Sequence, residues 1–287
     1  MRNSASATAA LVARGVAFRA GDPRFRDLVS QSSGDLSRKL VVAAGMGVRD
    51  GSSPSDRFLV ALLERLTVPG LSAHYVLRKR AIEEVARRAA RDGFHQLVVI
   101  GAGLDTLAVR MRADHPDLNA IEVDHPATQK LKRDVLRAVG VGSDISFVAA
   151  DLTTERLSRA LERCGAYDRE AATLFIAEAV FLYLDEEEVR SALADVRHRN
   201  ATTRIAFTFF EAGRKRINFR NATLLADLWL RWRGEPPRWA IDPGAVSAFL
   251  ESERFKINSL MLDEAMHRDA PRNVALARGE HLVVADA

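Results

Sequence analysis

The chain has 287 residues, of which 47% are hydrophobic and 28% are charged. That is enough for one large domain with a sizeable core, and it excludes a disordered tail, a collagen-like repeat and a disulfide scaffold. The single cysteine, Cys164, excludes an internal disulfide and a cysteine-ligated metal centre, so we expect a cytoplasmic protein without a metal. The first residues lead into no apolar signal segment, and the strongest apolar stretch, 97–104, is far too short to span a membrane.

Basic residues outnumber acidic residues by 42 to 38, and the net charge of +4 is concentrated between residues 211 and 240. That segment holds seven basic and three acidic residues together with all three tryptophans. No stacking platform and no known binding motif accompanies these charges, so we expect no nucleic-acid partner.

The first ninety or so residues carry helical patterns, which predict a helical cap region over residues 1–94. Ser55 and Asp56 are typical of a helix N-terminus, and an apolar stripe runs from them to Pro69-Gly70. A second stripe ends near Gly93. The two stripes consist of Phe58, Leu59, Leu62, Leu63 and Leu66, and of Leu77, Ile82, Val85 and Ala89.

From Gln96 onward, short apolar runs alternate with helical windows across a region, 95–287, that we expect to form one compact unit with the cap. This alternation predicts an α/β fold with a doubly wound, mostly parallel sheet of seven strands, and a ligand site at the carboxyl ends of the strands. One helix begins in the acidic cluster 185–188, a charge that favours a helix N-terminus. The predicted strands are Leu97–Ile100, Ala120–Val123, Ile145–Val148, Leu174–Ala177, Ile205–Phe210, Phe255–Leu262 and His281–Ala285.

The turn after the first predicted strand, Gly101-Ala102-Gly103-Leu104-Asp105-Thr106, begins like a dinucleotide-binding loop but has Thr106 in place of the third glycine. Asp105 brings a carboxylate to the place where a pyrophosphate would bind, which disfavours NAD, FAD and ATP and therefore a dehydrogenase. A cationic nucleoside cofactor without phosphate fits better. S-adenosyl-L-methionine has these properties, and the glycines would let the backbone approach it closely.

Each of the next three predicted strands is also followed by an acidic residue. Asp124, 21 residues beyond Gly103, is placed to accept hydrogen bonds from both ribose hydroxyls. Asp151 is placed to accept one from the adenine amino group while Leu152 packs on the ring, and Glu178 is placed near the methionine part. The series of strand-end carboxylates therefore predicts an S-adenosyl-L-methionine site.

Four segments of the sequence contain these residues: LVVIGAGLDTLAVRM at 97–111, IEVDHP at 121–126, ADL at 150–152 and FIAEAVFLYL at 175–184. Together they resemble the leucine carboxyl methyltransferase family, which includes polyketide-type bacterial O-methyltransferases. The similarity runs from about Arg78 to Leu184, and residues 6–9 resemble the family's N-terminal segment. The resemblance implies a class I methyltransferase with a Rossmann-like fold.

Carried over residue by residue, the resemblance implies that Arg78 pairs with the methionine carboxylate of the cofactor and that Gly101 lines the first turn. It also implies that Asp124 holds the ribose, that Asp151 and Leu152 hold the adenine, and that Glu178 holds the amino-acid end. Two positions depart from the family pattern. Leu107 replaces an arginine, which puts a local salt bridge in doubt, and Ala179 replaces a glycine, which would narrow the floor of the pocket.

The basic segment at about 211–240 is expected to be a helical insert, because Leu224, Leu225, Leu228, Trp229 and Trp232 form an amphipathic stripe. One reading packs this stripe on the body of the protein. The other makes the insert a lid over the strand ends, in which Trp229 and Trp232 wall an acceptor pocket and an arginine such as Arg220 steers an acidic acceptor. Both can hold at once.

We therefore expect an enzyme that uses S-adenosyl-L-methionine to esterify the carboxylate of a small molecule of secondary metabolism; a carrier-bound acyl group or a peptide C-terminus would also fit. A carboxylate is already ionised and needs only alignment, for which Tyr183 is the candidate. A hydroxyl acceptor would need a base, and His74, His125 and His267 are the candidates. A non-catalytic cofactor-binding protein is the remaining alternative. The sequence does not indicate an oligomeric state.

Overall fold

A seven-stranded sheet of order β3-β2-β1-β4-β5-β7-β6 forms the centre of the computed structural model, which describes residues 6–45, 47, 49, 51–197, 202–212 and 217–287. Neighbours from β3 to β5 pair in parallel, and β7 is antiparallel to both of its neighbours. The predicted mostly parallel sheet is confirmed. Its strands are β1 Gln96–Ile100, β2 Asn119–Asp124, β3 Ser146–Ala149, β4 Thr173–Ala177, β5 Thr203–Phe210, β6 Lys256–Met261 and β7 Glu280–Asp286.

Helices cover both faces of the sheet, as a doubly wound fold requires. Successive residues of a strand point to opposite faces, so Val98 and Ile100 belong to one hydrophobic core while Leu97 and Val99 belong to the other. The first core is closed by α7 Leu157–Glu162, α8 Glu186–Val196 and α10 Val246–Ser252. The second is closed by α4 Leu71–Arg91, α5 Leu107–Asp114 and α6 Pro126–Ala138.

Local signals account for some of the helix boundaries. Asp185 begins α8 with a capping box, in which its side chain accepts from the Glu188 amide and Glu188 accepts from the Asp185 amide. The predicted start of α3 at Ser55 is wrong by two residues: Ser53 is the N-cap and Pro54 is the first helical residue, because proline fits that position. α3 therefore spans Pro54–Leu66.

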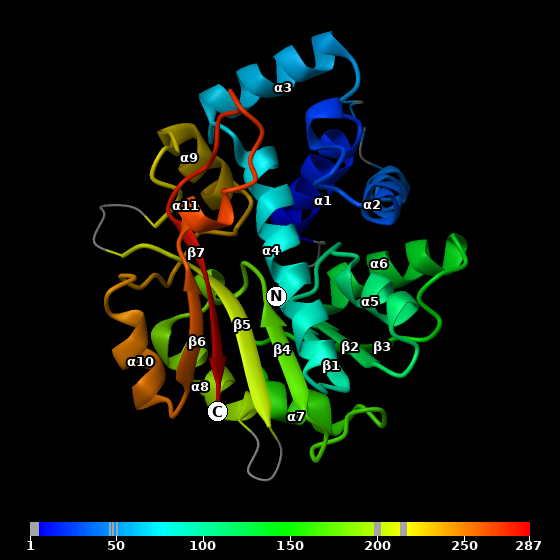
Figure 1. Ribbon diagram of the computed structural model, residues 1–287, viewed down its shortest axis with the longest axis vertical. Helices are drawn as coiled ribbons and strands as arrows, with labels where there is room; N and C mark the ends of the chain where they lie inside the picture. The colour runs from blue at the N-terminus through cyan, green and yellow to red at the C-terminus, as the bar shows by residue number, and fades with distance from the viewer. Residues whose placement is uncertain (1–5, 46, 48, 50, 198–201, 213–216) are drawn as a thin grey trace.

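The remaining helices gather at the end of the sheet where the parallel strands finish (Figure 1). The chain begins there with helices that precede β1, in agreement with the predicted cap over 1–94, although the division into regions remains a prediction. No helix among the described residues has both the length and the apolar character needed to cross a bilayer. These helices are α1 Ala7–Ala20, η1 Pro23–Phe25, α2 Gln31–Ala43, α3, η2 Phe181–Tyr183, α9 Leu224–Trp232 and α11 Asp263–Met266.

Candidate active site

A cavity of about 170 Å³ lies at the carboxyl ends of β1, β2 and β4. The structure brings most of the predicted site residues together around it. Asp151 and Leu152 are not among its lining residues, and neither are Trp229, Trp232 or Arg220. The predicted residues that do line it are Arg78, Gly101, Ala102, Gly103, Asp105, Asp124, Glu178 and Tyr183.

The glycine turn after β1 forms one wall of the cavity. Gly101 has φ +62°, and a Cβ there would lie closer to a methyl group of Val180 than van der Waals contact allows. Gly103 has φ +52°, and a Cβ there would lie 3.0 Å from the Cβ of Ala9. Only glycine meets both demands, since other residues rarely adopt positive φ. The turn is therefore built for close approach of the backbone to whatever occupies the cavity.

Asp124 ends β2 and faces the cavity with its carboxylate held by the backbone. The amides of Gly103 and His125 each donate a hydrogen bond of 2.6 Å to it. Burial raises the pKa of Asp124, and these two hydrogen bonds oppose that rise. Each carboxylate oxygen retains a further lone pair, so Asp124 can accept from a diol such as ribose.

Asp105 is engaged within the protein. It accepts from the amides of Thr106 (2.6 Å) and Leu107 (3.2 Å) at the start of α5, and it lies 3.1 Å from Lys79 Nζ. Burial alone would raise the pKa of this carboxyl, but the nearby cations Lys79, Arg110 and Lys132 outweigh burial and lower it. Asp105 is therefore ionised, and its charge is balanced by Lys79 and by the amides at the start of α5. It is not an unpaired charge that faces the cavity.

Arg78 joins two carboxylates at the other end of the cavity. Its guanidinium contacts Glu178 at 2.8 Å and Glu280 of β7 at 2.8 Å, and Lys79 contacts Glu178 at 3.1 Å. Burial by itself would lower the pKa of Arg78, but the negative charges of Glu280 and Glu178 outweigh burial and raise the pKa above its usual value. The guanidinium therefore stays charged. Behind them, His74 contacts Glu280 at 2.7 Å. The amino-acid end of the predicted site is thus a buried array of paired charges.

The backbone at Ala179 gives a physical reason for the glycine that the resemblance leads us to expect at this position. Its φ is +52°, a conformation that costs a residue with a Cβ on the order of 1–2 kcal/mol. The amide of Ala179 donates to Thr208 Oγ1 at 2.9 Å, which helps to hold the turn between Glu178 and Val180. Leu107, the other departure, is the first residue of α5 and is buried in the core.

The start of α1 closes the cavity from above. Ser6, Thr8, Ala9 and Val12 line it, and Glu235, which follows α9, caps the helix. The buried Glu235 carboxylate accepts from the amides of Ala7 (2.8 Å) and Thr8 (3.0 Å) and from the Thr8 hydroxyl. One side chain therefore ties the segment after α9 to the wall of the cavity.

The remaining predicted residues lie elsewhere. Asp151 accepts from the amide and hydroxyl of Thr153 beside the cavity, 3.9 Å from His125, and Leu152 packs against the core. Arg220 pairs with Asp263 at 2.7 Å. Most of the apolar stripe of α9 does not pack on the body of the protein: Leu224, Leu225, Leu228 and Trp232 are exposed and Trp229 is half-buried, because α9 turns Ala226 inward instead. Arg214, Lys215 and Arg216 of the basic segment lie outside the described residues.

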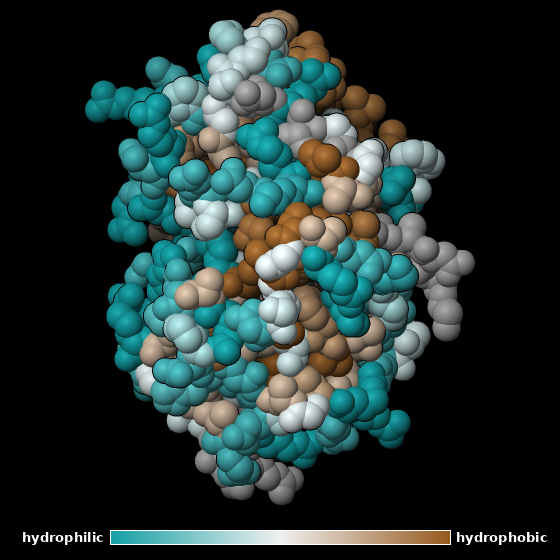
Figure 2. All heavy atoms as spheres, turned by 90° about the vertical axis from the view of Figure 1, so that its right-hand side faces the viewer, coloured by the Kyte–Doolittle hydropathy of each residue, from teal (hydrophilic) through white to brown (hydrophobic). Residues whose placement is uncertain are grey.

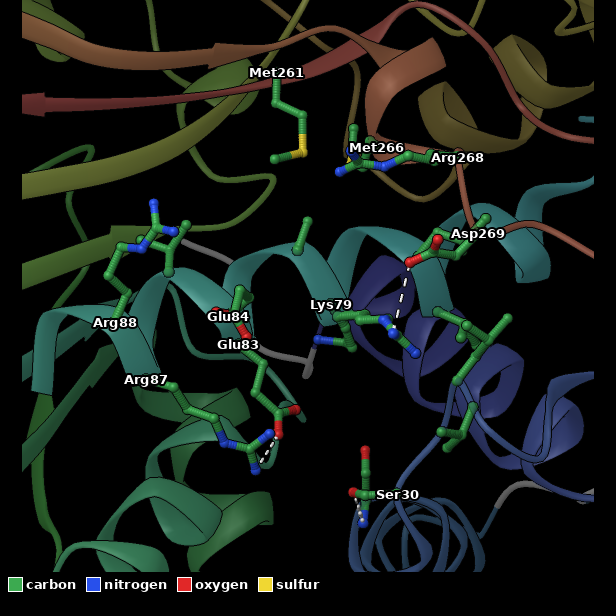
Figure 3. A pocket seen from close by; sticks show the side chains of 18 of the residues that line it. Ser30, Lys79, Glu83, Glu84, Arg87, Arg88, Met261, Met266, Arg268 and Asp269 are labelled. Atoms are coloured by element: carbon green, nitrogen blue, oxygen red, sulfur yellow. Dashed lines mark hydrogen bonds and ion pairs between the residues drawn. The ribbon is translucent and has the colours of Figure 1, made fainter. Parts of the chain in front are cut away.

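A larger cavity, about 940 Å³, lies along α4 and is walled by β6 and α11 on the side of Met261 and Met266 (Figure 3). Several of its charged residues pair with one another; Glu83 and Arg87, for example, lie 2.7 Å apart and are joined in Figure 3. None of the residues that follow the parallel strands lines it. We therefore assign the functional site to the smaller cavity. Lys79 lines both.

Comparison with known proteins identifies the family of this chain. The model of the leucine carboxyl methyltransferase family matches residues 7–197, which is more than half of the chain. The chain belongs to the leucine carboxyl methyltransferase family. The match covers α1 to α8, and so includes the glycine turn and all four acidic strand ends.

Relatives of the chain in this family carry provisional names as S-adenosyl-L-methionine-dependent methyltransferases. One from Streptomyces coelicolor is 32% identical over 67% of this chain and 64% of its own length. Another from Mycolicibacterium smegmatis is 27% identical over 95% of this chain and 91% of its own length. The chain spans slightly less than two thirds of the first curated relatives it matches, 61% and 64%.

Solved structures share the fold of this family member. A protein from Thermobifida fusca, described provisionally as a methyltransferase, has a TM-score of 0.58 at 14% identity and covers 86% of this chain and 92% of its own. A protein from Streptomyces avermitilis has a TM-score of 0.56 at 14% identity and covers 89% and 97%. The fold is that of the class I methyltransferases, as predicted.

Sequence reasoning missed several residues that build the site. Lys79 stands in the basic run Arg78-Lys79-Arg80, which is typical of a solvated helix face, and its place directly after Arg78 is the one local signal for it. Glu280 and Glu235 offered none, since each reaches the site from a segment far away in the chain, through β7 and the loop after α9. Such contacts depend on the tertiary fold alone.

Proposed function

We propose that this family member transfers a methyl group from S-adenosyl-L-methionine to the carboxylate of a small-molecule acceptor. The observation that carries the proposal is the convergence of a close-approach glycine turn, Asp124, and the Arg78–Glu178 pair on one cavity at the carboxyl ends of the strands. Ligand sites of open α/β sheets lie at such ends.

The residues present fit the cofactor. Asp124 would hold the ribose hydroxyls, Glu178 would hold the ammonium group, and Arg78 and Lys79 lie where the cofactor's carboxylate would find a cation. When bound, the cofactor supplies an activated methyl group on a sulfonium. The chain's own task is then to align the acceptor with that methyl group and to exclude water, which supplies on the order of 7–11 kcal/mol in well-aligned reactions.

The positions of the histidines favour a carboxylate acceptor. His74 and His267 are buried and bonded to each other at 2.8 Å, and neither lines the cavity. Burial lowers the pKa of both rings, that of His267 to about 4. An acceptor that is already ionised requires no base, and Tyr183 lines the cavity, where it is positioned to orient such an acid.

A hydroxyl acceptor is the second candidate, because His125 lines the cavity. His125 belongs to the β2 end, next to Asp124 and Asp151, so it could act as base for an acceptor that enters from that side. A profile of kcat/KM against pH separates the two. A rise of kcat/KM with pH that disappears in His125→Asn supports the hydroxyl, whereas a flat profile supports the carboxylate.

Cofactor binding is tested first, by calorimetry with S-adenosyl-L-methionine. Asp124→Asn removes a charge and one acceptor from the ribose contact, and we expect at least a tenfold loss of affinity. Asp134→Asn is the matched control, since Asp134 lies on the exposed side of α6 and pairs with Lys130. Equal affinity in both variants and in the wild type would reject the site.

The acceptor is tested separately, by mass spectrometry. The protein is incubated with methyl-labelled cofactor and a pooled set of carboxylic and phenolic acids. Labelled methyl esters support the proposal, and labelled aryl ethers support the hydroxyl candidate. Tight cofactor binding without any labelled product from acceptors of either class, carrier-bound acids and peptide C-termini included, would indicate a non-catalytic binding protein.

A further inference from the structure

Two helices, α3 and α9, turn apolar faces to the solvent. Phe58 is 71% exposed, Leu228 62% and Trp232 76%. α3 contains no buried residue at all, and α9 buries only Ala226. Large exposed apolar side chains are ordinary when single, but not when gathered. We call the following set the α3/α9 face: Phe58, Leu62, Leu63, Leu66, Leu224, Leu225, Leu228 and Trp232.

The α3/α9 face is continuous because the two helices meet end to end. The amide of Thr223 donates to the Thr67 carbonyl at 2.8 Å, and the Thr223 hydroxyl donates to the Leu66 carbonyl at 2.6 Å. The inner side of α9 packs through Ala226 against Val68. Strongly hydrophobic residues run along the upper edge of the molecule in Figure 2, the end at which Figure 1 places α3.

The two helices carry the same pattern. Each has large apolar residues at i, i+4 and i+8 and an arginine at i+7, which places one arginine beside one apolar stripe. One acidic residue of each helix turns inward, where Glu64 accepts from the Ser72 amide and Asp227 accepts from the Asn218 side chain. The two patterns are Phe58, Leu62, Arg65 and Leu66, and Leu224, Leu228, Arg231 and Trp232.

The composition of the face matches a protein interface more closely than a lipid-binding one. Interface cores are enriched in aromatic residues and arginine and depleted of lysine and acidic residues. Helices that lie on membranes instead carry lysine and arginine along the opposite, polar side. On the polar side of α3, by contrast, the acidic Asp56 stands next to Arg57 in the sequence and pairs with Arg49 at 2.9 Å.

The area is also that of a dimer interface. With roughly 150–200 Å² for each large apolar side chain when fully exposed, the eight side chains present on the order of 800 Å². A stable interface buries about 800 Å² on each partner, and a patch of this size exceeds what monomers leave exposed.

We propose that the α3/α9 face is the contact between two copies of this chain. Two-fold symmetry is the commonest arrangement of homo-oligomers, and it places the same patch on both partners. Here it would pack α3 and α9 of each copy into a four-helix layer. The contact leaves the cofactor cavity in each copy intact, because no residue of the face lines that cavity.

The test is the mass of the full-length protein in solution, measured by light scattering and by sedimentation across a dilution series. We expect twice the 31.6 kDa of one chain at about 10 µM. Phe58→Glu and Leu228→Glu each place a charge in the face of both partners, so each should weaken the dimer at least 100-fold. Val42→Glu, on α2, is the control, since Val42 is 60% exposed but lies outside the face.

Monomeric Phe58→Glu and Leu228→Glu proteins with wild-type circular dichroism, beside a dimeric Val42→Glu protein, support the proposal. A wild-type protein that remains monomeric at about 100 µM overturns it. So does a dimer that survives in both glutamate variants. A monomeric wild type that sediments with phosphatidylglycerol vesicles also overturns it and assigns the face to a membrane surface.

Discussion

Glu235 allows the sharpest test of how the cavity is closed. It is 2% exposed and caps α1 through the amides of Ala7 and Thr8 and the Thr8 hydroxyl. A hydrogen bond to a charged group contributes about 1.5–3 kcal/mol, and losing an N-cap costs about 0.5–2 kcal/mol. Because Ser6 still accepts from the Ala9 amide at 3.1 Å, part of the cap remains. We expect Glu235→Ala to lower the free energy of unfolding by about 2 kcal/mol.

Two measurements check this value. Thermal unfolding should shift by roughly 3–4 °C, and amide exchange in the first turn of α1 should accelerate about 30-fold. Glu235→Gln, which keeps an acceptor without charge, should cost about half as much. Glu251→Ala, an exposed glutamate of α10, should change stability by less than about 0.5 kcal/mol. If Glu235→Ala behaves like Glu251→Ala in both measurements, the capping role is refuted.

Three further outcomes follow from the site. Ala179→Gly should raise the free energy of unfolding by about 1 kcal/mol in chemical denaturation, because it relieves a positive φ; a destabilised variant would contradict this. Gly101→Ala should weaken S-adenosyl-L-methionine binding more than tenfold in calorimetry, since the new Cβ meets Val180, and unchanged affinity would show that the turn yields. The pKa of His267 is lowered to about 4 in the folded state, by burial first, so the folded protein binds fewer protons and stability should fall as the pH drops from about 6.5 to 4. In His267→Gln the slope in that window should flatten, and an identical pH profile would remove His267 as its source.

The sheet and its acidic edge could be predicted because their signals are local. The apolar run at 97–100 belongs to β1, which begins one residue earlier, at Gln96. Asp124 and Glu178 fall at strand ends, where parallel topology brings them to one edge. Such patterns depend only on the spacing of residues along the chain.

The closure of the site and the position of the insert could not be predicted from spacing. The stripe on α9 predicts an amphipathic helix, which the structure confirms, but periodicity does not say whether the apolar side faces the protein or the solvent. The second partner of Arg78 is likewise not predictable, since Glu280 is 202 residues away and meets Arg78 only through the pairing of β7 with β5.

The place of β7 between β5 and β6 links the antiparallel part of the sheet to the chemistry of the site. Glu280, its first residue, is the carboxylate that Arg78 and His74 share. Because the antiparallel pairing of β7 with β5 sets the position of Glu280, a substitution that shifts this pairing would leave the buried Arg78 without one of its two counter-ions. Residues far from the cavity can thus change the charge balance at its amino-acid end.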